Sequence, residues 1–285
     1  MLFEGRKIAF IGPGVMAEAI ISGLIHRGVV APDMMTAAGP TLERLTHLAT
    51  KYTIHTTTDN AEAVRQADVV ALTVKPQRLE KVMQALRGCI QPKALVLSII
   101  AGTTIEKLSH GLGHNIVVRS MPNTPAQIGE GITVWTASRQ VSAEQLEMAR
   151  QILQALGEEI FLEEENYLDM ATALSGTGPA YVFLFMEAMV DAGVHLGFPR
   201  RIAEQLVAQT VRGSVDFYRN NEDSIHLAGL RNQVTSPGGT SAAALYYLEK
   251  AGFRTAISRA VWAAYERSRE LGRSSKPHAP EEEAS

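Results

Sequence analysis

The sequence has a single cysteine and only a small excess of acidic over basic residues. Cys89 is the only cysteine among the 285 residues, which excludes an intrachain disulfide and a metal cluster built on cysteines. Acidic and basic side chains nearly balance, 30 against 27, so no basic field would attract a phosphate backbone. We therefore expect no nucleic-acid partner, and the expected partner is a small molecule.

Long apolar runs and a targeting segment are also missing. No window approaches the roughly 20 apolar residues of a membrane span. The N-terminus, MLFEGRKIAFIG, lacks the basic start and apolar stretch of a signal peptide. His110 and His114 are four residues apart but have no third ligand nearby, so no metal site is expected. These absences predict a cytoplasmic protein without a membrane partner.

The first half of the chain alternates short apolar runs with amphipathic stretches. This order predicts an α/β Rossmann-type domain over residues 1–163, a doubly wound parallel sheet with helices on both faces. A further strand is expected at 131–137, and a helix at 142–157 that is capped by Ser142 and stopped by Gly157. The expected parallel strands cover 7–11, 33–38, 68–74, 94–100 and 116–121.

From about Tyr167 the strand pattern ends, so residues 164–273 are expected to form an all-α domain. Segment 179–197 is apolar on more than one face, which a single helical layer could not bury. We expect a homodimer or a higher homo-oligomer to form through this domain. Residues 274–285 are polar and contain two prolines, which predicts a disordered tail. Helix breaks are expected at 175–179, 197–199, 220–223 and 236–239.

A glycine turn, GPGVMA at 12–17, follows the first strand and opens a helical pattern. Its first glycine permits a tight turn, its second lets the backbone approach a pyrophosphate, and the small Ala17 suits helix packing. The free N–H groups at the helix start would face the anion. The turn predicts a nicotinamide dinucleotide bound at Gly12, Gly14, Val15 and Met16.

The end of the second strand bears on which dinucleotide is bound. NAD sites usually carry an acidic residue there for the ribose 2′-OH, whereas residues 36–41 read TAAGPT, without a carboxylate. A 2′-phosphate near Ala38 and Pro40 would not be repelled, so NADP(H) is expected, with NAD(H) as the alternative. Arg44 could reach that phosphate, but we expect it to be a solvated surface side chain.

Loops at the carboxyl ends of the strands supply the remaining expected cofactor residues. Lys75 is either a general acid or a contact for ribose or solvent. The loop of Asn123 is either a rigid connection or the wall beside the nicotinamide. The expected residues are Asn60, Val74, Lys75, Pro76, Ala101, Gly102 and Asn123.

Together the motifs resemble the pyrroline-5-carboxylate reductases, from about Lys7 to Leu271. The most specific are SGTGPAY and SPGGTS, in this order and spacing. The resemblance implies reduction of Δ1-pyrroline-5-carboxylate to L-proline, the last step of proline synthesis, by hydride transfer from the nicotinamide. The shared segments are GPGVMAEAI at the start, VKPQ at 74–77, MPNTPAQIGEG at 121–131, LSGTGPAY at 174–181, VTSPGGTSAAAL at 234–245 and GFR at 252–254.

The resemblance also implies a substrate site on the second glycine-rich motif, where a turn feeding a helix start would hold the substrate carboxylate. Ser241 stands where threonine is usual and is the expected catalytic residue, which orients an iminium or supplies a proton to the imine nitrogen. Glu165 could bond the ring nitrogen or belong to the solvated acidic run at 163–165. The expected substrate residues are Glu165, Ser236, Gly238, Gly239, Thr240 and Ser241.

Two alternatives stand beside this hypothesis. A reductase of the same architecture could act on another cyclic imine or on a β-hydroxy acid. The latter class would want a catalytic lysine, whereas Lys250, the only lysine between 108 and 275, lies at an expected helix end. A non-enzymatic dinucleotide-sensing protein is the second alternative, although the substrate motif departs from the family only at Ser241. Ala38 and Gly39 replace hydroxyl residues often found at the family's 2′-phosphate site, which leaves NADH open.

Overall fold

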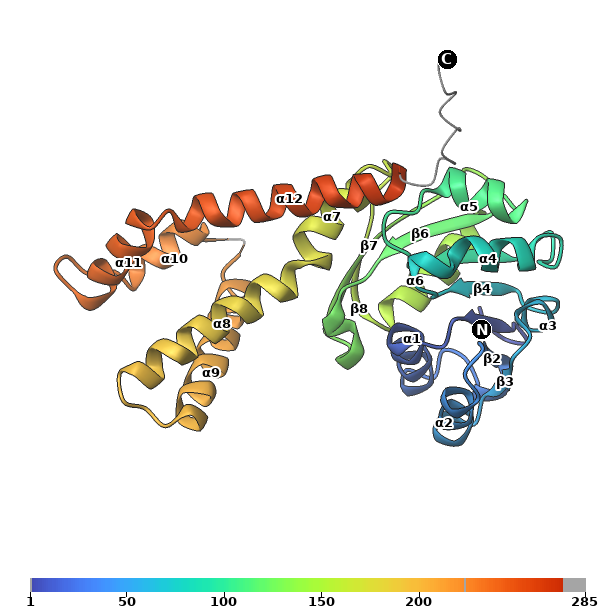
Figure 1. Cartoon of the computed structure of the whole chain (residues 1–285), viewed down its shortest axis with the longest axis horizontal. Coiled ribbons are helices and arrows are strands. Elements are labelled where there is room, and N and C mark those ends of the chain that lie inside the picture. The colour runs from blue at the N-terminus through green and yellow to red at the C-terminus, as the bar shows by residue number, and fades with distance from the viewer. Residues whose placement is uncertain (1, 223, 274–285) are drawn as a thin grey trace, which may run out of the picture. The chain divides into compact units, whose positions relative to one another are not determined.

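The computed structural model describes residues 2–222 and 224–273 (Figure 1). They form two compact units. The sheet unit runs to Thr177 and takes up the chain again at Ala264, and the helical unit is Gly178–Ala263. The tail expected at 274–285 lies outside the described residues.

The strands of the described chain form one sheet in the order β3-β2-β1-β4-β5-β6-β7-β8. The first six in chain order are parallel, which confirms the predicted Rossmann-type sheet. The order reverses between β1 and β4, where such sheets bind ligands beyond the strand ends. The strands are β1 (Ile8–Ile11), β2 (Met35–Ala38), β3 (His55–Thr57), β4 (Val69–Leu72), β5 (Leu95–Ser98), β6 (Val117–Met121), β7 (Gly131–Ala137) and β8 (Gly157–Phe161).

Three features of the sheet were not predicted. β7 runs antiparallel to β6, because residues 122–130 between them hold only the short 3-10 helix η2 (Thr124–Ile128), too little for a parallel crossover. β3 and β8 were missed because their segments, HTT and GEEIF, are short and partly polar. Gly157, expected only to stop a helix, is the first residue of β8.

Helices cover both faces of the sheet. Leu48 and Ile152 belong to the core of one face, and Leu79 and Leu108 to the core of the other. Because both faces are covered, every residue of β1, β4 and β5 is buried. The first face carries α1 (Val15–His26), α2 (Leu42–Tyr52) and α6 (Ala143–Gln154), and the second α3 (Asn60–Val64), α4 (Pro76–Leu86) and α5 (Ile105–Leu112); the 3-10 helix η1 (Pro32–Met34) precedes β2.

The helix break expected at 175–179 is reduced to a bend at the single residue Thr177. α7 (Tyr167–Ala171) passes through a π-helical turn, η3 (Thr172–Gly176), into α8 (Gly178–His195). The amide and hydroxyl of Thr177 both donate to the carbonyl of Thr172, each over 2.8 Å. These bonds to earlier carbonyls keep the glycine-rich segment helical.

The continuous helix also corrects the expectation about membrane spans. Within the described residues, Tyr167–His195 is long and apolar enough to cross a membrane by length and composition alone. One such helix is weak evidence for a span, because the core helix of a soluble protein passes the same test. A helix of this length was not predicted from the sequence, because a helix break was expected at 175–179.

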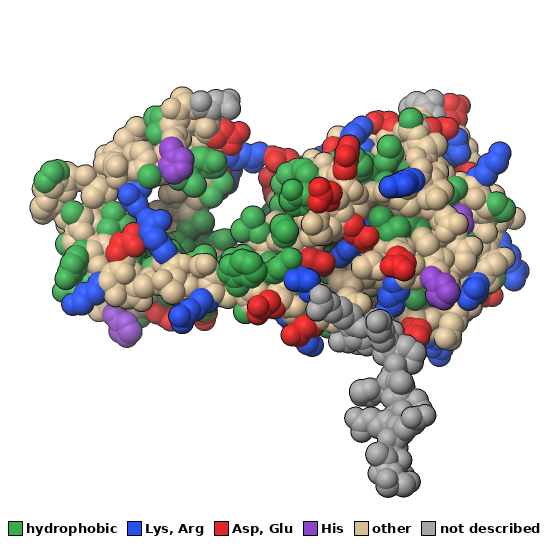
Figure 2. Space-filling view, turned by 90° about the horizontal axis from the view of Figure 1, so that it is seen from above, with side chains coloured by type: hydrophobic (Ala, Val, Ile, Leu, Met, Phe, Trp, Pro, Cys, Tyr) green, Lys and Arg blue, Asp and Glu red, His purple; other side chains and the backbone are tan. Residues whose placement is uncertain are grey.

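The described residues of the helical unit form helices and no strands, as predicted for this part of the chain. α8 packs on α9 through Val190, Ala203 and Val207. Large apolar side chains such as Phe183 (62% exposed) and Leu184 (67%) face water in a single chain, and Figure 2 shows hydrophobic side chains at the surface of this unit. The remaining helices are α9 (Arg200–Arg219), α10 (Leu227–Gln233), α11 (Thr240–Lys250) and α12 (Phe253–Arg273).

The boundary expected after residue 163 stays a prediction. Residues 164–177, expected in the helical domain, lie in the sheet unit. Leu168 and Ala171 of α7 pack with Val134 of β7, so this segment is tied to the sheet by its own apolar contacts.

Candidate active site

The glycine turn after β1 is closed by its neighbours. Gly12 has φ +95, and its amide donates to the carbonyl of Ala38 over 2.9 Å. A Cβ on Gly12 would lie 2.5 Å from Cγ1 of Val74. Position 12 therefore requires glycine for its backbone conformation and for space.

The start of α1 is open to an anion. Gly14 is its N-cap, with φ −79 and ψ −171, and no side chain caps the helix. The first helical bond joins the Glu18 amide to the Gly14 carbonyl over 3.0 Å. The helix itself therefore offers no acceptor to the amides of Val15, Met16 and Ala17, and these donors can hold a pyrophosphate.

Arg44 is not the solvated side chain that the sequence suggested. Its Nε donates to the carbonyl of Pro13 over 2.7 Å, and its Nη2 to the carbonyl of Gly14 over 3.2 Å. The same Nη2 lies 2.5 Å from Glu18 Oε2. Arg44 therefore ties α2 to the glycine turn, with a carboxylate of α1 holding the guanidinium in place.

Glu18 collects several donors around that guanidinium. Its Oε1 accepts hydrogen bonds from Lys51 Nζ and from the Tyr52 hydroxyl, each over 2.9 Å. Burial would raise the pKa of Glu18, but hydrogen bonds from Lys51, Tyr52 and Arg44 outweigh it and lower the pKa from 4.5 to about 2. Glu18 is therefore charged at neutral pH.

A cavity of about 380 Å³ opens beside the turn and brings together Gly12, Pro40, Asn60 and Val74 of the predicted cofactor residues. Asn60 Oδ1 is buried there without a hydrogen-bond partner among the described residues. An unpaired buried acceptor is costly unless a ligand or water meets it, so the site fits a bound polar molecule. The other lining residues are Gly39, Thr58, Arg78, Lys81, Val82 and Ala85.

Arg78 and Lys81 are the charged residues of this cavity, and sequence reasoning missed them. They lie three residues apart on α4, so they share one face of the helix. A signal was present in the sequence, because PQRLEK directly follows the loop after β4.

The other predicted cofactor residues stand at strand ends or helix starts outside that cavity. Gly102 has φ +69, and a Cβ there would lie 3.1 Å from the Cβ of Leu271, so α12 covers this loop. Asn123 Oδ1 accepts a hydrogen bond from the Ile132 amide over 3.0 Å, which anchors the start of η2. Ala38 is the last residue of β2, and Ala101 lies in the loop after β5. Lys75 is the exposed N-cap of α4, and Pro76 is the first residue of that helix.

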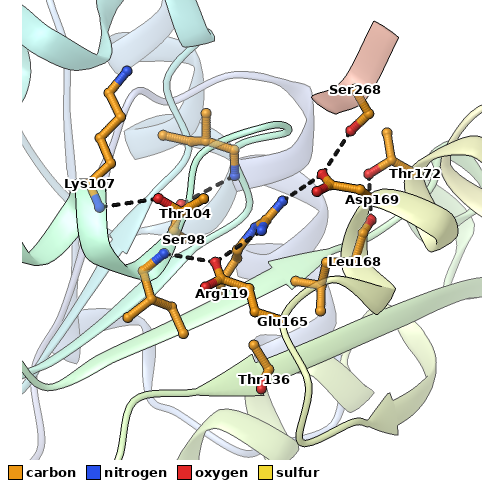
Figure 3. A network of polar contacts seen from close by, with 12 residues as sticks. Ser98, Thr104, Lys107, Arg119, Thr136, Glu165, Leu168, Asp169, Thr172 and Ser268 are labelled. Carbon is orange, nitrogen blue, oxygen red and sulfur yellow. Dashed lines mark hydrogen bonds and ion pairs between the residues drawn. The ribbon is translucent and has the colours of Figure 1, made fainter. Parts of the chain in front are cut away.

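Glu165 belongs to a partly buried polar network rather than to a solvated acidic run (Figure 3). Its Oε1 accepts from Arg119 Nη1 over 2.9 Å and from the Ile105 amide over 2.8 Å. Arg119 is 3% exposed and also pairs with Asp169, whose Oδ1 accepts from the buried Ser268 hydroxyl over 2.9 Å. The network joins β6, α5, α7 and α12, and no residue but Glu165 was singled out in the sequence.

The second glycine turn, like the first, leads into a helix that no side chain caps. Gly238 has φ +71, and Gly239 is the N-cap of α11 with φ −79 and ψ 170, without a capping side chain. The first helical bond joins the Ala243 amide to the Gly239 carbonyl. The amides of Thr240 and Ser241 therefore lack a helical acceptor, as those of Val15 and Met16 do.

The structure gathers the predicted substrate residues of this motif on one turn of the helical unit. Ser236 accepts at its carbonyl from the Gly239 amide over 3.1 Å, and Thr240 and Ser241 begin α11. Ser241 is half-buried. Glu165 lies in the sheet unit.

Known proteins resemble the chain over nearly its whole length. A pyrroline-5-carboxylate reductase of Synechocystis is 42% identical over 94% of this chain and 98% of the relative. One of Pseudomonas aeruginosa is 44% identical over 93% and 96%. The chain belongs to the pyrroline-5-carboxylate reductase family. The resemblance inferred from the motifs is thereby confirmed.

Family domains and solved structures agree. Residues 165–271 match the domain described as pyrroline-5-carboxylate reductase dimerisation, and residues 7–102 match one described as NADP oxidoreductase coenzyme F420-dependent. A solved reductase of this family from Coxiella burnetii has a TM-score of 0.85 at 37% identity, covering 93% of this chain and 98% of that one. The Plasmodium falciparum enzyme, solved with NADP bound, has a TM-score of 0.86 at 32% identity, covering 94% and 99%.

Proposed function

We propose that the chain reduces Δ1-pyrroline-5-carboxylate to L-proline with NADPH, and with NADH as the second donor, in the last step of proline synthesis. Membership of the reductase family supports the reaction. The observation that carries the proposal is that two glycine turns each lead into a helix without a capping side chain. Gly14 and Gly239 are the N-caps of these helices, and both have φ −79. One turn suits a pyrophosphate and the other a substrate carboxylate.

The sheet unit would hold the dinucleotide. The amides of Val15 and Met16 bind the pyrophosphate, and Asn60 and Val74 line the cavity for the adenosine end. The bound cofactor supplies the hydride that reduces the imine carbon. The loops of Lys75, Ala101 and Asn123 remain proposed contacts for the cofactor. Gly102, in the same loop as Ala101, is closely packed and would contact the cofactor through its backbone.

The helical unit would hold the imine acid. The amides of Thr240 and Ser241 bind its carboxylate at the start of α11, and Gly238 and Gly239 keep the approach free of side chains. An iminium substrate already carries its proton, so the Ser241 hydroxyl needs only to orient the ring nitrogen. Glu165 stays a proposed substrate contact through Oε2, since Oε1 already accepts two N–H groups.

The family assignment of residues 165–271 to a dimerisation domain supports a homo-oligomer. We propose that exposed apolar side chains of the helical unit, such as Phe183 and Leu184, form that interface. We further propose that the enzyme works in the cytoplasm, with neither a nucleic-acid nor a membrane partner.

Turnover by purified protein tests the function directly. The oxidation of NADPH and of NADH would be followed with pyrroline-5-carboxylate as the substrate. The two controls are the six-membered imine piperideine-6-carboxylate and a β-hydroxy acid supplied with NADP⁺. We expect clear preference for the five-membered imine. Absence of turnover with it, while either control reacts, would contradict the proposal.

A further inference from the structure

Arg78 and Lys81 are uncommitted cations in the cavity beside the glycine turn. Both are exposed, and within the described part of the chain neither side chain has a carboxylate partner. No acidic residue lines the cavity. Gly39 and Pro40, in the loop that follows β2, also line the cavity. The two cations therefore share one space with the loop that faces the adenosine ribose in Rossmann-type sheets.

Arg44, the cation nearest in sequence to that loop, is committed elsewhere. Two of its nitrogens donate to carbonyls of the glycine turn, and one of them pairs with Glu18. Glu18 is charged at neutral pH because its pKa is about 2. Arg44 would have to give up a carboxylate and two carbonyls to bind a phosphate. Its contacts instead support the pyrophosphate turn, which NADPH and NADH use alike.

We propose that Arg78 and Lys81, and not Arg44, supply the positive charge that recognises the 2′-phosphate of NADPH. The inference rests on the proposed function, since it assumes a nicotinamide dinucleotide in this cavity. A 2′-phosphate carries about two negative charges at neutral pH, and two cations on one helix face can meet them. NADH lacks this group, so the α4 cations set the preference between the two cofactors.

Isothermal titration of the full chain with NADP⁺ and with NAD⁺ tests the assignment without turnover. The variants are Arg78→Gln, Lys81→Gln and the double variant. Loss of a charge-assisted hydrogen bond predicts a fall in NADP⁺ affinity of about tenfold for each variant. NAD⁺ affinity should stay near the wild-type value. Arg87→Gln, at the end of α4 and outside the cavity, is the matched control and should change neither affinity.

Arg44→Gln separates the two arginines. It should weaken NADP⁺ and NAD⁺ by the same factor, because it loosens the turn that holds the pyrophosphate of both. Equal losses of both cofactors in the Arg78 and Lys81 variants would indicate contact with adenine and overturn the inference. A selective NADP⁺ loss in Arg44→Gln would overturn it too.

Failure of the inference and failure of the proposed function give different results. If wild-type protein binds both dinucleotides but the ratio of affinities is unchanged in the double variant, only the assignment of Arg78 and Lys81 is wrong. If wild-type protein binds neither dinucleotide, the proposed function is wrong and the assignment falls with it.

Discussion

Arg119 Nη2 donates to Asp169 Oδ1 over 3.0 Å, which joins β6 to α7 inside the sheet unit. Arg119 is 3% exposed, whereas the carboxylates of Glu165 and Asp169 keep 31% and 21% of their side chains in water. The guanidinium is thus the buried member, and its removal leaves two carboxylates beside each other without their shared cation.

We therefore expect Arg119→Met to lower the free energy of unfolding by about 3 kcal/mol, the lower end for a broken buried pair, because both carboxylates retain water. Urea denaturation of the full chain measures this. Arg200→Met, which breaks the exposed pair with Asp191, should cost less than about 1 kcal/mol. Equal costs for the two variants would contradict a structural role for the network.

Gly12→Ala should strongly weaken dinucleotide binding. The substitution places a Cβ 2.5 Å from Val74 Cγ1 and imposes φ +95 on an L-residue, so the turn must move away from the pyrophosphate position. Titration with NADP⁺ measures the loss, which we expect to exceed tenfold. Gly88→Ala is the matched control, because Gly88 also has positive φ (+77) but nothing within 4 Å of its added Cβ.

The period of the apolar pattern was enough to predict the Rossmann-type sheet and the helical half, and the GPGVMA motif predicted the first glycine turn, because these depend on neighbours close in sequence. The substrate role of the second glycine turn was implied only by the family resemblance. The roles of Arg44 and Arg119 were not predictable in this way. Arg44 bonds Pro13, 31 residues away, and Arg119 bonds Asp169, 50 residues away. The partner of each arginine is distant in sequence, and only the folded chain brings the two residues into contact. The π turn at Thr172–Gly176 was missed because two glycines usually end a helix.

Glu18 gives a pH dependence of stability. Its pKa in the folded chain is about 2, below the ordinary 4.5, so the folded state favours the charged form. The stabilisation is fully present above about pH 4.5 and is lost as pH falls toward 2. The stability difference between wild type and Glu18→Gln should therefore be constant above pH 4.5 and shrink below it.

Denaturation midpoints across this range would measure that difference. Glu43→Gln, an exposed carboxylate of α2, serves as control because it makes none of the contacts of Glu18. A Glu18→Gln difference that is independent of pH down to 2 would show that the carboxylate is not stabilised by its donors.

The exposed apolar side chains of the helical unit predict where a second copy binds. Leu184 is 67% exposed on α8, and Leu184→Asp should place a charge in the interface and dissociate the oligomer. Sedimentation velocity measures the change. Leu42→Asp, similarly exposed at 70% but on the sheet unit, should leave the assembly intact. An unchanged sedimentation coefficient for Leu184→Asp would exclude this face of α8 from the interface.

Ser241 is the residue on which the proposed chemistry depends most. Ser241→Ala keeps the backbone amides that hold the carboxylate but removes the hydroxyl that orients the ring nitrogen. We expect a fall in kcat/KM for pyrroline-5-carboxylate of about tenfold to a hundredfold, the size of one lost hydrogen bond to a charged group. NADP⁺ affinity should be unchanged, because Ser241 lies outside the dinucleotide turn. Ser241→Thr restores the hydroxyl with a stiffer rotamer and should recover or exceed wild-type kcat/KM. Wild-type kinetics in Ser241→Ala would remove this hydroxyl from the mechanism and leave the carboxylate turn as the sole contribution of α11.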